Sequence, residues 1–155
     1  MTANPPSPVA AIVLAAGRSS RMGALKPLLP FAGVRVVEHV VATLAAAGIA
    51  PIHVVVGHRG AEVAAVARRC GAVVVDNPDF DLGMYSSIRA GIASLPTSVA
   101  GTLLLPVDIA AVRATTFALI AEAGRSTATL VHPSVRGEPG HPPLLPRAPV
   151  AETLA

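Results

Sequence analysis

The sequence predicts an α/β fold of three layers, in which a Rossmann-like, mostly parallel sheet carries helices on both faces. Apolar runs such as residues 9–14 and 52–56 are continuous rather than alternating, which is typical of strands buried on both faces. Segments of helical spacing separate these runs, and glycine or proline turns join them. This order of strands and helices predicts parallel βαβ units with right-handed crossovers. With 155 residues, of which 52% are hydrophobic, the chain can bury one core.

The first third of the chain predicts a strand, a helix and a second strand. Residues 9–14 form an uninterrupted apolar run, as expected of a central strand. The segment 36–47 has apolar side chains at helical spacing, and Gly48 stands where a glycine commonly ends a helix. The run 52–56 is β-branched apart from one histidine, which predicts the second buried strand.

The middle of the chain predicts a further helix, strand and helix. Residues 61–70 are expected to form a helix whose last turn carries two arginines, which is favourable beside the negative end of the helix dipole. Residues 72–75 predict a third covered strand, which ends at Asp76. Asn77-Pro78 breaks that strand, and a helix is expected from residue 85 or 86 to about residue 94.

The last third of the chain continues the same alternation. Residues 101–105 predict a fourth buried strand, residues 112–124 a helix and residues 127–132 a fifth strand. A loop rich in glycine and proline follows over residues 133–142, and residues 148–155 predict the start of another helix.

The amino-acid composition of the chain limits the kinds of molecule that it is expected to bind. The formal charge of +3 fits an anionic small substrate, whereas runs of at most two basic residues and 3% aromatic residues disfavour a nucleic-acid surface. The single cysteine excludes an internal disulfide and a cysteine zinc cluster, and a reducing cytoplasm is the expected setting. No uncharged apolar run approaches the roughly 18 residues that span a bilayer, so no membrane partner is expected. Residues 1–8 are expected to form a flexible lead, and residues 9–155 a single domain.

A loop with two glycines and three cations follows the first strand. Gly17 and Gly23 allow backbone N–H groups to approach an anion closely. Arg18, Arg21 and Lys26 can offset phosphate charge, and Lys26 is the only lysine in the chain. In open α/β sheets, a loop at this place binds nucleotides. An ordinary loop with solvated arginines is the alternative, because the spacing fits neither a Walker A loop nor Gly-x-Gly-x-x-Gly.

Three further side chains are candidates for the same end of the sheet. Asp108 follows the fourth predicted strand, where a carboxylate can bind Mg²⁺ or cap the next helix. Ser86 and Ser87 fall in the first turn of the helix after Asn77-Pro78, where a hydroxyl can cap the helix or contact a ligand. The residues alone leave both alternatives open in each case.

The segment 14–30 resembles the signature Leu-Ala-Ala-Gly-x-Ser-x-Arg-Met-Gly-x-x-Lys-x-Leu-Leu-Pro of the MobA-like NTP transferases, and is most similar to their molybdenum-cofactor cytidylyltransferase branch. Residues 77–91 resemble the family's Asn-Pro…Gly-Met-x-x-Ser-Ile-x-x-Gly segment, and residues 140–142 resemble its Gly-His-Pro substrate loop. Where the family usually has Gly-Asp-x-Pro, this chain has Val-Asp-Ile-Ala over residues 107–110, so the aspartate matches and the proline does not.

This resemblance implies a fold of the nucleotide-diphospho-sugar transferase type. It also implies that Lys26 and Arg21 are catalytic, since they would grip the phosphates and stabilise the α-phosphoryl group, and that Asp108 binds Mg²⁺. The implied nucleotide-binding residues are Leu14, Ala15, Ala16, Gly17, Arg18, Ser19, Gly23, Gly83 and Ser87. The implied acceptor-binding residues are Arg136, Gly140 and His141.

The activity that the resemblance implies is transfer of a nucleotidyl group from an NTP to a phosphorylated acceptor, with release of pyrophosphate. CTP is the expected donor with GTP second, molybdopterin is the expected acceptor, and a molybdoenzyme or a chaperone is a candidate partner. A sugar- or alditol-phosphate transferase and a non-catalytic nucleotide-binding module are the alternatives. Relatives continue into a segment with a second metal-binding aspartate, so the C-terminal part of the domain is expected to be missing here.

Overall fold

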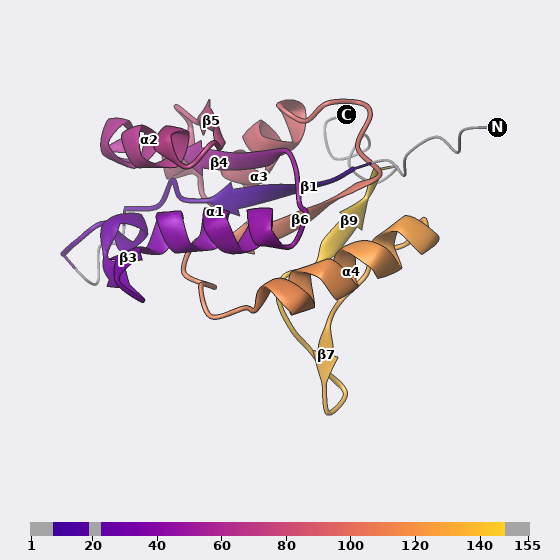
Figure 1. The fold of residues 1–155 in the computed structure, drawn as a ribbon. Coiled ribbons are helices and arrows are strands. Elements are labelled where there is room, and N and C mark those ends of the chain that lie inside the picture. Colours follow the sequence, from indigo (N-terminus) through magenta and orange to yellow (C-terminus); the bar gives the residue numbers. More distant parts are fainter. Residues whose placement is uncertain (1–7, 19–22, 148–155) are drawn as a thin grey trace.

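The computed structural model describes residues 8–18 and 23–147 and contains a five-stranded sheet at its centre (Figure 1). The strand order is β5-β4-β1-β6-β9, so the first strand of the chain lies in the middle. Within this sheet β5, β4, β1 and β6 run parallel, whereas β9 is antiparallel to β6. The strands are β1 (Val9–Leu14), β4 (Ile52–Val56), β5 (Val73–Asp76), β6 (Gly101–Pro106) and β9 (Leu144–Pro146).

Helices cover both faces of this sheet, which gives the three predicted layers (Figure 1). The helices α1 (Val36–Ala46), α2 (Gly60–Arg69) and α4 (Ala114–Ser126) share one apolar core with one face of the sheet. The helix α3 (Met84–Ala93) packs on the opposite face, in a second core with Ile12 of β1. The predicted α/β class with a mostly parallel sheet is therefore confirmed.

A glycine brings α3 unusually close to the central strand. A Cβ atom at Gly91 would lie 2.6 Å from Cγ2 of Ile12 and 3.2 Å from Cγ2 of Val55. Because ordinary carbon contacts are about 3.5–4.0 Å, no larger residue fits there without movement of the helix or the strand. This close packing fixes the position of the first turn of α3 above the end of β1.

Short elements lie in the loops outside the sheet. Two one-turn helices, η1 (Lys26–Leu28) and η2 (Phe80–Leu82), precede α1 and α3 respectively. One hairpin pairs Pro30 and Phe31 (β2) with Val34 and Arg35 (β3). A second hairpin, formed by β7 (Ser134–Val135) and β8 (Glu138–Pro139), projects away from the sheet (Figure 1).

The strand predicted at residues 127–132 is wrong. Only Val131 pairs there, through a single antiparallel bridge to Leu144, and the fifth position of the sheet is taken by β9 instead. Leu144 is fully buried, and hypothetical Cβ atoms at Gly101 and Gly124 would lie within 3.0 Å of its side chain. The space left by these two glycines therefore seats Leu144 between β6 and α4.

The third strand is also less covered than predicted. β5 lies at the edge of the sheet, and Val73 is 47% exposed. Its neighbour on one side is β4, and no strand of the described chain pairs with its other side. The helix predicted at residues 112–124 begins and ends two residues later, as α4.

Two expectations fall at the limits of the described chain. The predicted lead at residues 1–8 lies outside it except for Pro8, and the predicted helix at 148–155 lies outside it completely. Among the helices of residues 8–18 and 23–147, none combines the length and the apolar character that crossing a bilayer requires.

Candidate functional site

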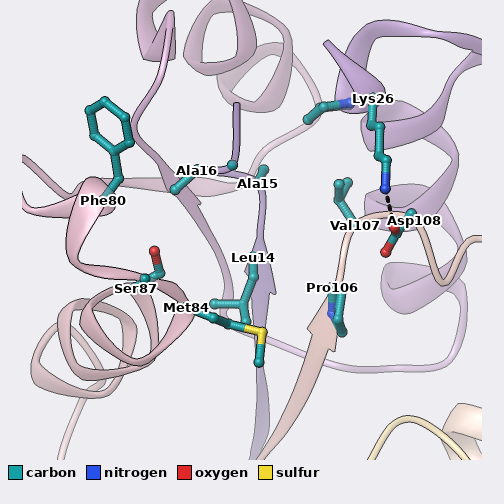
Figure 2. Close-up of a pocket in the computed structure, with 13 residues that line it drawn as sticks. Leu14, Ala15, Ala16, Lys26, Phe80, Met84, Ser87, Pro106, Val107 and Asp108 are labelled. Carbon is teal, nitrogen blue, oxygen red and sulfur yellow. Dashed lines mark hydrogen bonds and ion pairs between the residues drawn. The ribbon is translucent and has the colours of Figure 1, made fainter. Parts of the chain in front are cut away.

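A cavity of about 330 Å³ opens where β1 and β6 end (Figure 2). The end of β1 forms its floor, the start of α3 and η2 form one side, and Lys26 with Asp108 forms the other. Lys26 and Asp108 are the only charged side chains that line it in the described part of the chain. The lining residues are Leu14, Ala15, Ala16, Gly17, Lys26, Pro27, Phe80, Gly83, Met84, Ser87, Pro106, Val107 and Asp108.

The loop after β1 presents backbone donors to this cavity. The Ala15 N–H donates to the Val55 carbonyl and the Ala16 carbonyl accepts from the His58 N–H, so the contact with the β4 side continues past the strand end. The N–H groups of Ala16 and Gly17 donate to no acceptor within residues 8–18 and 23–147. Ala16 is buried, and buried backbone donors are nearly always paired, so its amide is a candidate donor to a bound ligand.

Lys26 and Asp108 form an ion pair on one side of the cavity. The Lys26 Nζ atom lies 2.8 Å from Oδ2 of Asp108, which places the amine and the carboxylate at one edge of the sheet, as predicted. The two side chains are 38% and 47% exposed, so the ion pair is worth at most about 1 kcal/mol. A ligand with stronger charges can therefore separate the pair at little cost.

The alternative role of Asp108 as a helix cap is wrong. The N-cap residue of α4 is Arg113, and no side chain caps that helix. Asp108 instead lies two residues after the end of β6, where its carboxylate is directed to Lys26 (Figure 2).

A second cavity, of about 290 Å³, lies on the other side of the same ion pair. It shares Lys26 and Asp108 with the first cavity, and all its other lining side chains are apolar. These are Leu29, Phe31, Val36, Ala110 and Ala111. The ion pair therefore stands between two adjoining cavities.

The capping explanation for Ser86 and Ser87 is also wrong. Gly83 is the N-cap residue of α3, and no side-chain hydrogen bond caps the helix. The Ser86 hydroxyl lies 2.8 Å from the backbone carbonyl oxygens of both Asp79 and Gly83. The Ser87 hydroxyl lines the cavity and accepts a hydrogen bond from Nδ2 of Asn77 at 3.0 Å.

Arg18 joins the loop after β1 to η2. Its Nε and Nη2 atoms donate to both carboxylate oxygens of Asp81, at 2.8 and 2.7 Å, and its guanidinium lies 5.5 Å from the centre of the Phe80 ring. Hydrogen bonding to Arg18 lowers the pKa of Asp81, and the same bond raises the pKa of Arg18. Arg18 does not line the cavity but fastens the loop to the segment that carries Phe80, which does.

The structure brings together only part of the predicted site. Ser19 and Arg21 lie outside the described residues, and Gly23 is described but lines neither cavity. The predicted acceptor residues Arg136, Gly140 and His141 also line neither cavity, and Arg136 lies in the turn between β7 and β8. Their roles remain predictions.

Several lining residues were not predicted. Phe80 and Met84 approach from η2 and α3, and Pro106 and Val107 come from the end of β6. Met84 belongs to the Gly-Met-x-x-Ser-Ile segment, and Pro106 and Val107 directly precede Asp108, so these three residues are sequence neighbours of predicted site residues. Phe80 had no signal of this kind.

The described residues offer Mg²⁺ only part of a coordination shell. No group of three acidic, histidine or cysteine side chains in the described chain could hold a metal ion by itself. Asp108 is the one carboxylate that lines the cavity in this part of the chain. Mg²⁺ usually takes one or two carboxylates and fills the rest of its shell with water and substrate phosphates, so Asp108 fits a site that is completed by a nucleotide.

A model of the MobA-like NTP transferase domain family matches residues 11–155. The bifunctional IPC transferase and DIPP synthase of Rubrobacter xylanophilus is 46% identical over 94 residues, which cover 57% of this chain and 22% of that protein. The bifunctional protein GlmU of Xylella fastidiosa is 33% identical over 127 residues, covering 80% and 27% respectively. A solved nucleotidyl transferase from Methanothermobacter superposes with a TM-score of 0.81 at 29% identity, covering 94% of this chain and 74% of that one. The chain thus spans about a quarter of the length of these curated relatives.

Proposed function

Because this chain belongs to the MobA-like NTP transferase family, we propose that it transfers a nucleotidyl group from an NTP to a phosphorylated acceptor. The observation that carries this proposal is the meeting of Lys26 and Asp108 beside backbone donors of the loop after β1, at one edge of the sheet. A cation, an acid and backbone N–H groups that donate to no described residue suit a triphosphate better than an uncharged ligand.

The proposed reaction is an in-line displacement at the α-phosphorus. A phosphate oxygen of the acceptor attacks that phosphorus, the bond to the bridging oxygen breaks, and pyrophosphate leaves. Little covalent chemistry falls to the protein, so its contribution is to position both substrates and to stabilise negative charge. Lys26 would exchange its bond with Asp108 for one to the phosphates, and the weakness of the exposed pair makes this exchange inexpensive.

Asp108, once separated from Lys26, would hold Mg²⁺ together with the phosphates. When bound, such an ion neutralises phosphate charge and orients the triphosphate for displacement. The predicted second cation, Arg21, would add to this neutralisation from the loop after β1.

For the two substrates, we propose CTP as the donor, with GTP as the second candidate, and molybdopterin as the acceptor. The likeness of residues 14–30 to the molybdenum-cofactor cytidylyltransferase branch supports this choice. The cavity beyond Lys26 and Asp108 offers space for the body of the acceptor, with its phosphate at the shared wall. A molybdoenzyme or a chaperone would then receive the product.

The test is a pyrophosphate-release assay with each of the four NTPs, without acceptor, with molybdopterin and with a sugar phosphate. We expect Mg²⁺-dependent release with CTP and molybdopterin. Lys26→Ala should retain the fold and lower turnover at least about 100-fold, as expected when a charge partner of the transition state is removed. Arg59→Ala is the matched control, since it also removes one cation but from a surface pair with Glu62.

Three outcomes would contradict the proposal. Near-normal turnover of Lys26→Ala would remove Lys26 from the mechanism. Binding of Mg²⁺-NTP without any pyrophosphate release would indicate a non-catalytic binding module. Release with the sugar phosphate alone would replace the proposed acceptor while leaving the reaction class in place.

A further inference from the structure

Asn77 occupies a buried position between β5 and α3 that makes its amide orientation unambiguous. Its side chain is only 4% exposed, and its Oδ1 atom accepts a hydrogen bond from the Asp79 N–H at 3.0 Å. A backbone N–H can only donate, so the oxygen of the amide must be the atom on that side. The NH₂ group therefore faces the first turn of α3.

Both hydrogens of that NH₂ group are used on serine oxygens. Nδ2 donates to Oγ of Ser86 at 2.9 Å and to Oγ of Ser87 at 3.0 Å. Each serine oxygen thus acts as an acceptor toward Asn77, and each hydroxyl hydrogen must point elsewhere.

The two serines differ in where that hydrogen goes. The Ser86 hydroxyl donates to a backbone carbonyl, of Gly83 or of Asp79. The Ser87 hydroxyl has no acceptor among the described residues, although the side chain is only 5% exposed and lines the cavity at the end of β1. Figure 2 shows its oxygen on the side of α3 that faces Ala16 and Phe80.

We infer that Asn77 sets the hydrogen-bonding polarity of the nucleotide cavity, that is, whether Ser87 donates or accepts there. Because Asn77 donates to the Ser87 oxygen, the Ser87 hydroxyl is left to donate its hydrogen to an acceptor atom of the nucleobase. The inference rests on the proposed function, because it assigns a role within the same cavity. Asn77 is a positioning residue, which acts through Ser87, and Ser87 is the side chain that touches the base. The N3 and O2 atoms of cytosine, which are adjacent acceptors, suit such a donor.

The test measures Mg²⁺-dependent binding by calorimetry, without an acceptor substrate, for two probes. One probe is CTP, and the other is ribose 5-triphosphate, which carries the phosphates and the sugar but no base. We expect Ser87→Ala to weaken CTP binding about tenfold, the value of one net hydrogen bond, and to leave ribose 5-triphosphate unchanged. Ser86→Ala is the matched control, since it loses the other hydrogen bond from Nδ2 of Asn77 but should bind both probes as the wild type does.

Asn77→Asp tests the polarity itself. A carboxylate offers no hydrogen, so it accepts from the Ser87 hydroxyl and turns that hydrogen away from the cavity. We expect the same tenfold loss for CTP alone, with no further loss when Ser87→Ala is added. If Asn77→Asp does not fold, Asn77→Ala should give an intermediate loss for CTP and none for ribose 5-triphosphate.

Two results would overturn the inference, and a third concerns the proposed function. Equal weakening of both probes by Ser87→Ala would show that Ser87 acts on the phosphates or on the fold. Unchanged CTP binding by folded Asn77 variants would show that Asn77 does not set the polarity. A wild-type protein that binds no NTP would instead refute the proposed function.

Discussion

Gly91→Ala tests how closely α3 must approach the sheet. In the middle of a helix, this change alone should stabilise the protein by about 1 kcal/mol, because alanine has the higher helix propensity. The added Cβ atom, however, would lie 2.6 Å from Cγ2 of Ile12, about 1 Å closer than an ordinary carbon contact. Ile12 lies in the central strand and is fully buried, so the strand cannot retreat and α3 must move outward.

The size of the effect follows from these opposing contributions. Overpacking a core costs about 1–3 kcal/mol, which exceeds the gain in helix propensity in most of that range. We expect Gly91→Ala to lower the free energy of unfolding by up to about 2 kcal/mol and the Tm by up to about 8 °C. Since Ser87 lies one turn earlier on the same helix, NTP binding should weaken as well.

Urea unfolding followed by circular dichroism measures the first effect, and calorimetry with an NTP measures the second. Ile12→Ala supplies the matched test, because it removes the Ile12 atoms that the new methyl group would meet at 2.6 and 3.3 Å and leaves only the contact with Cγ2 of Val55 at 3.2 Å. Alone it should cost about 2–5 kcal/mol, and together with Gly91→Ala it should cost less than the sum. A stabilised Gly91→Ala protein, or strictly additive costs, would refute this account of the packing.

Three further predictions concern other parts of the molecule. Asp108→Asn should raise the Kd for Mg²⁺-NTP at least about tenfold, as expected for a lost charged contact, and leave binding in EDTA nearly unchanged; equal loss in both conditions would contradict a metal role. Burial lowers the pKa of His53, so the stability it contributes is complete above about pH 6.5 and falls as the pH drops toward the lowered pKa of the folded state; urea unfolding between pH 8 and pH 5 should show this fall, and His53→Gln should reduce it. Leu144→Ala should cost about 2–5 kcal/mol, whereas the partly exposed Leu145→Ala should cost clearly less; similar costs would place the contact of β9 elsewhere.

The central elements could be predicted from sequence because burial leaves a clear pattern of apolar residues. β1, β4 and β6 are continuous apolar runs, and α1 has apolar residues at helical spacing up to the glycine that follows it. The parallel order of these strands places the loop after β1 and the residue after β6 at one edge. The meeting of Lys26 and Asp108 could therefore be predicted from the sequence.

The C-terminal strand could not be predicted in the same way. β9 has three residues, one of which is a proline, and a second proline precedes it, whereas residues 127–132 look more like a strand. What selects β9 is the fit of Leu144 to the space left by two glycines, which are distant in sequence. Fits of this kind depend on three-dimensional packing and leave no local pattern.

The finer features of the site were hidden for a related reason. The sequence places Ser86 and Ser87 in one turn, but only the orientation of Asn77 distinguishes their roles. The pair of Arg18 and Asp81 joins residues 63 positions apart, and Phe80 enters the cavity from the same segment as Asp81. Such contacts arise from the meeting of loops, for which periodicity carries no information.

The pairing of β9 with β6 has a consequence for how the chain folds during its synthesis. Until residues 144–146 leave the ribosome, β6 presents an open, leucine-rich edge, and such edges invite pairing with foreign strands. Lys26 and Asp108 are made well before that moment. A nascent chain can thus contain Lys26 and Asp108 while this edge of β6 is still unpaired, and chaperones that shield apolar edges would matter most in that interval.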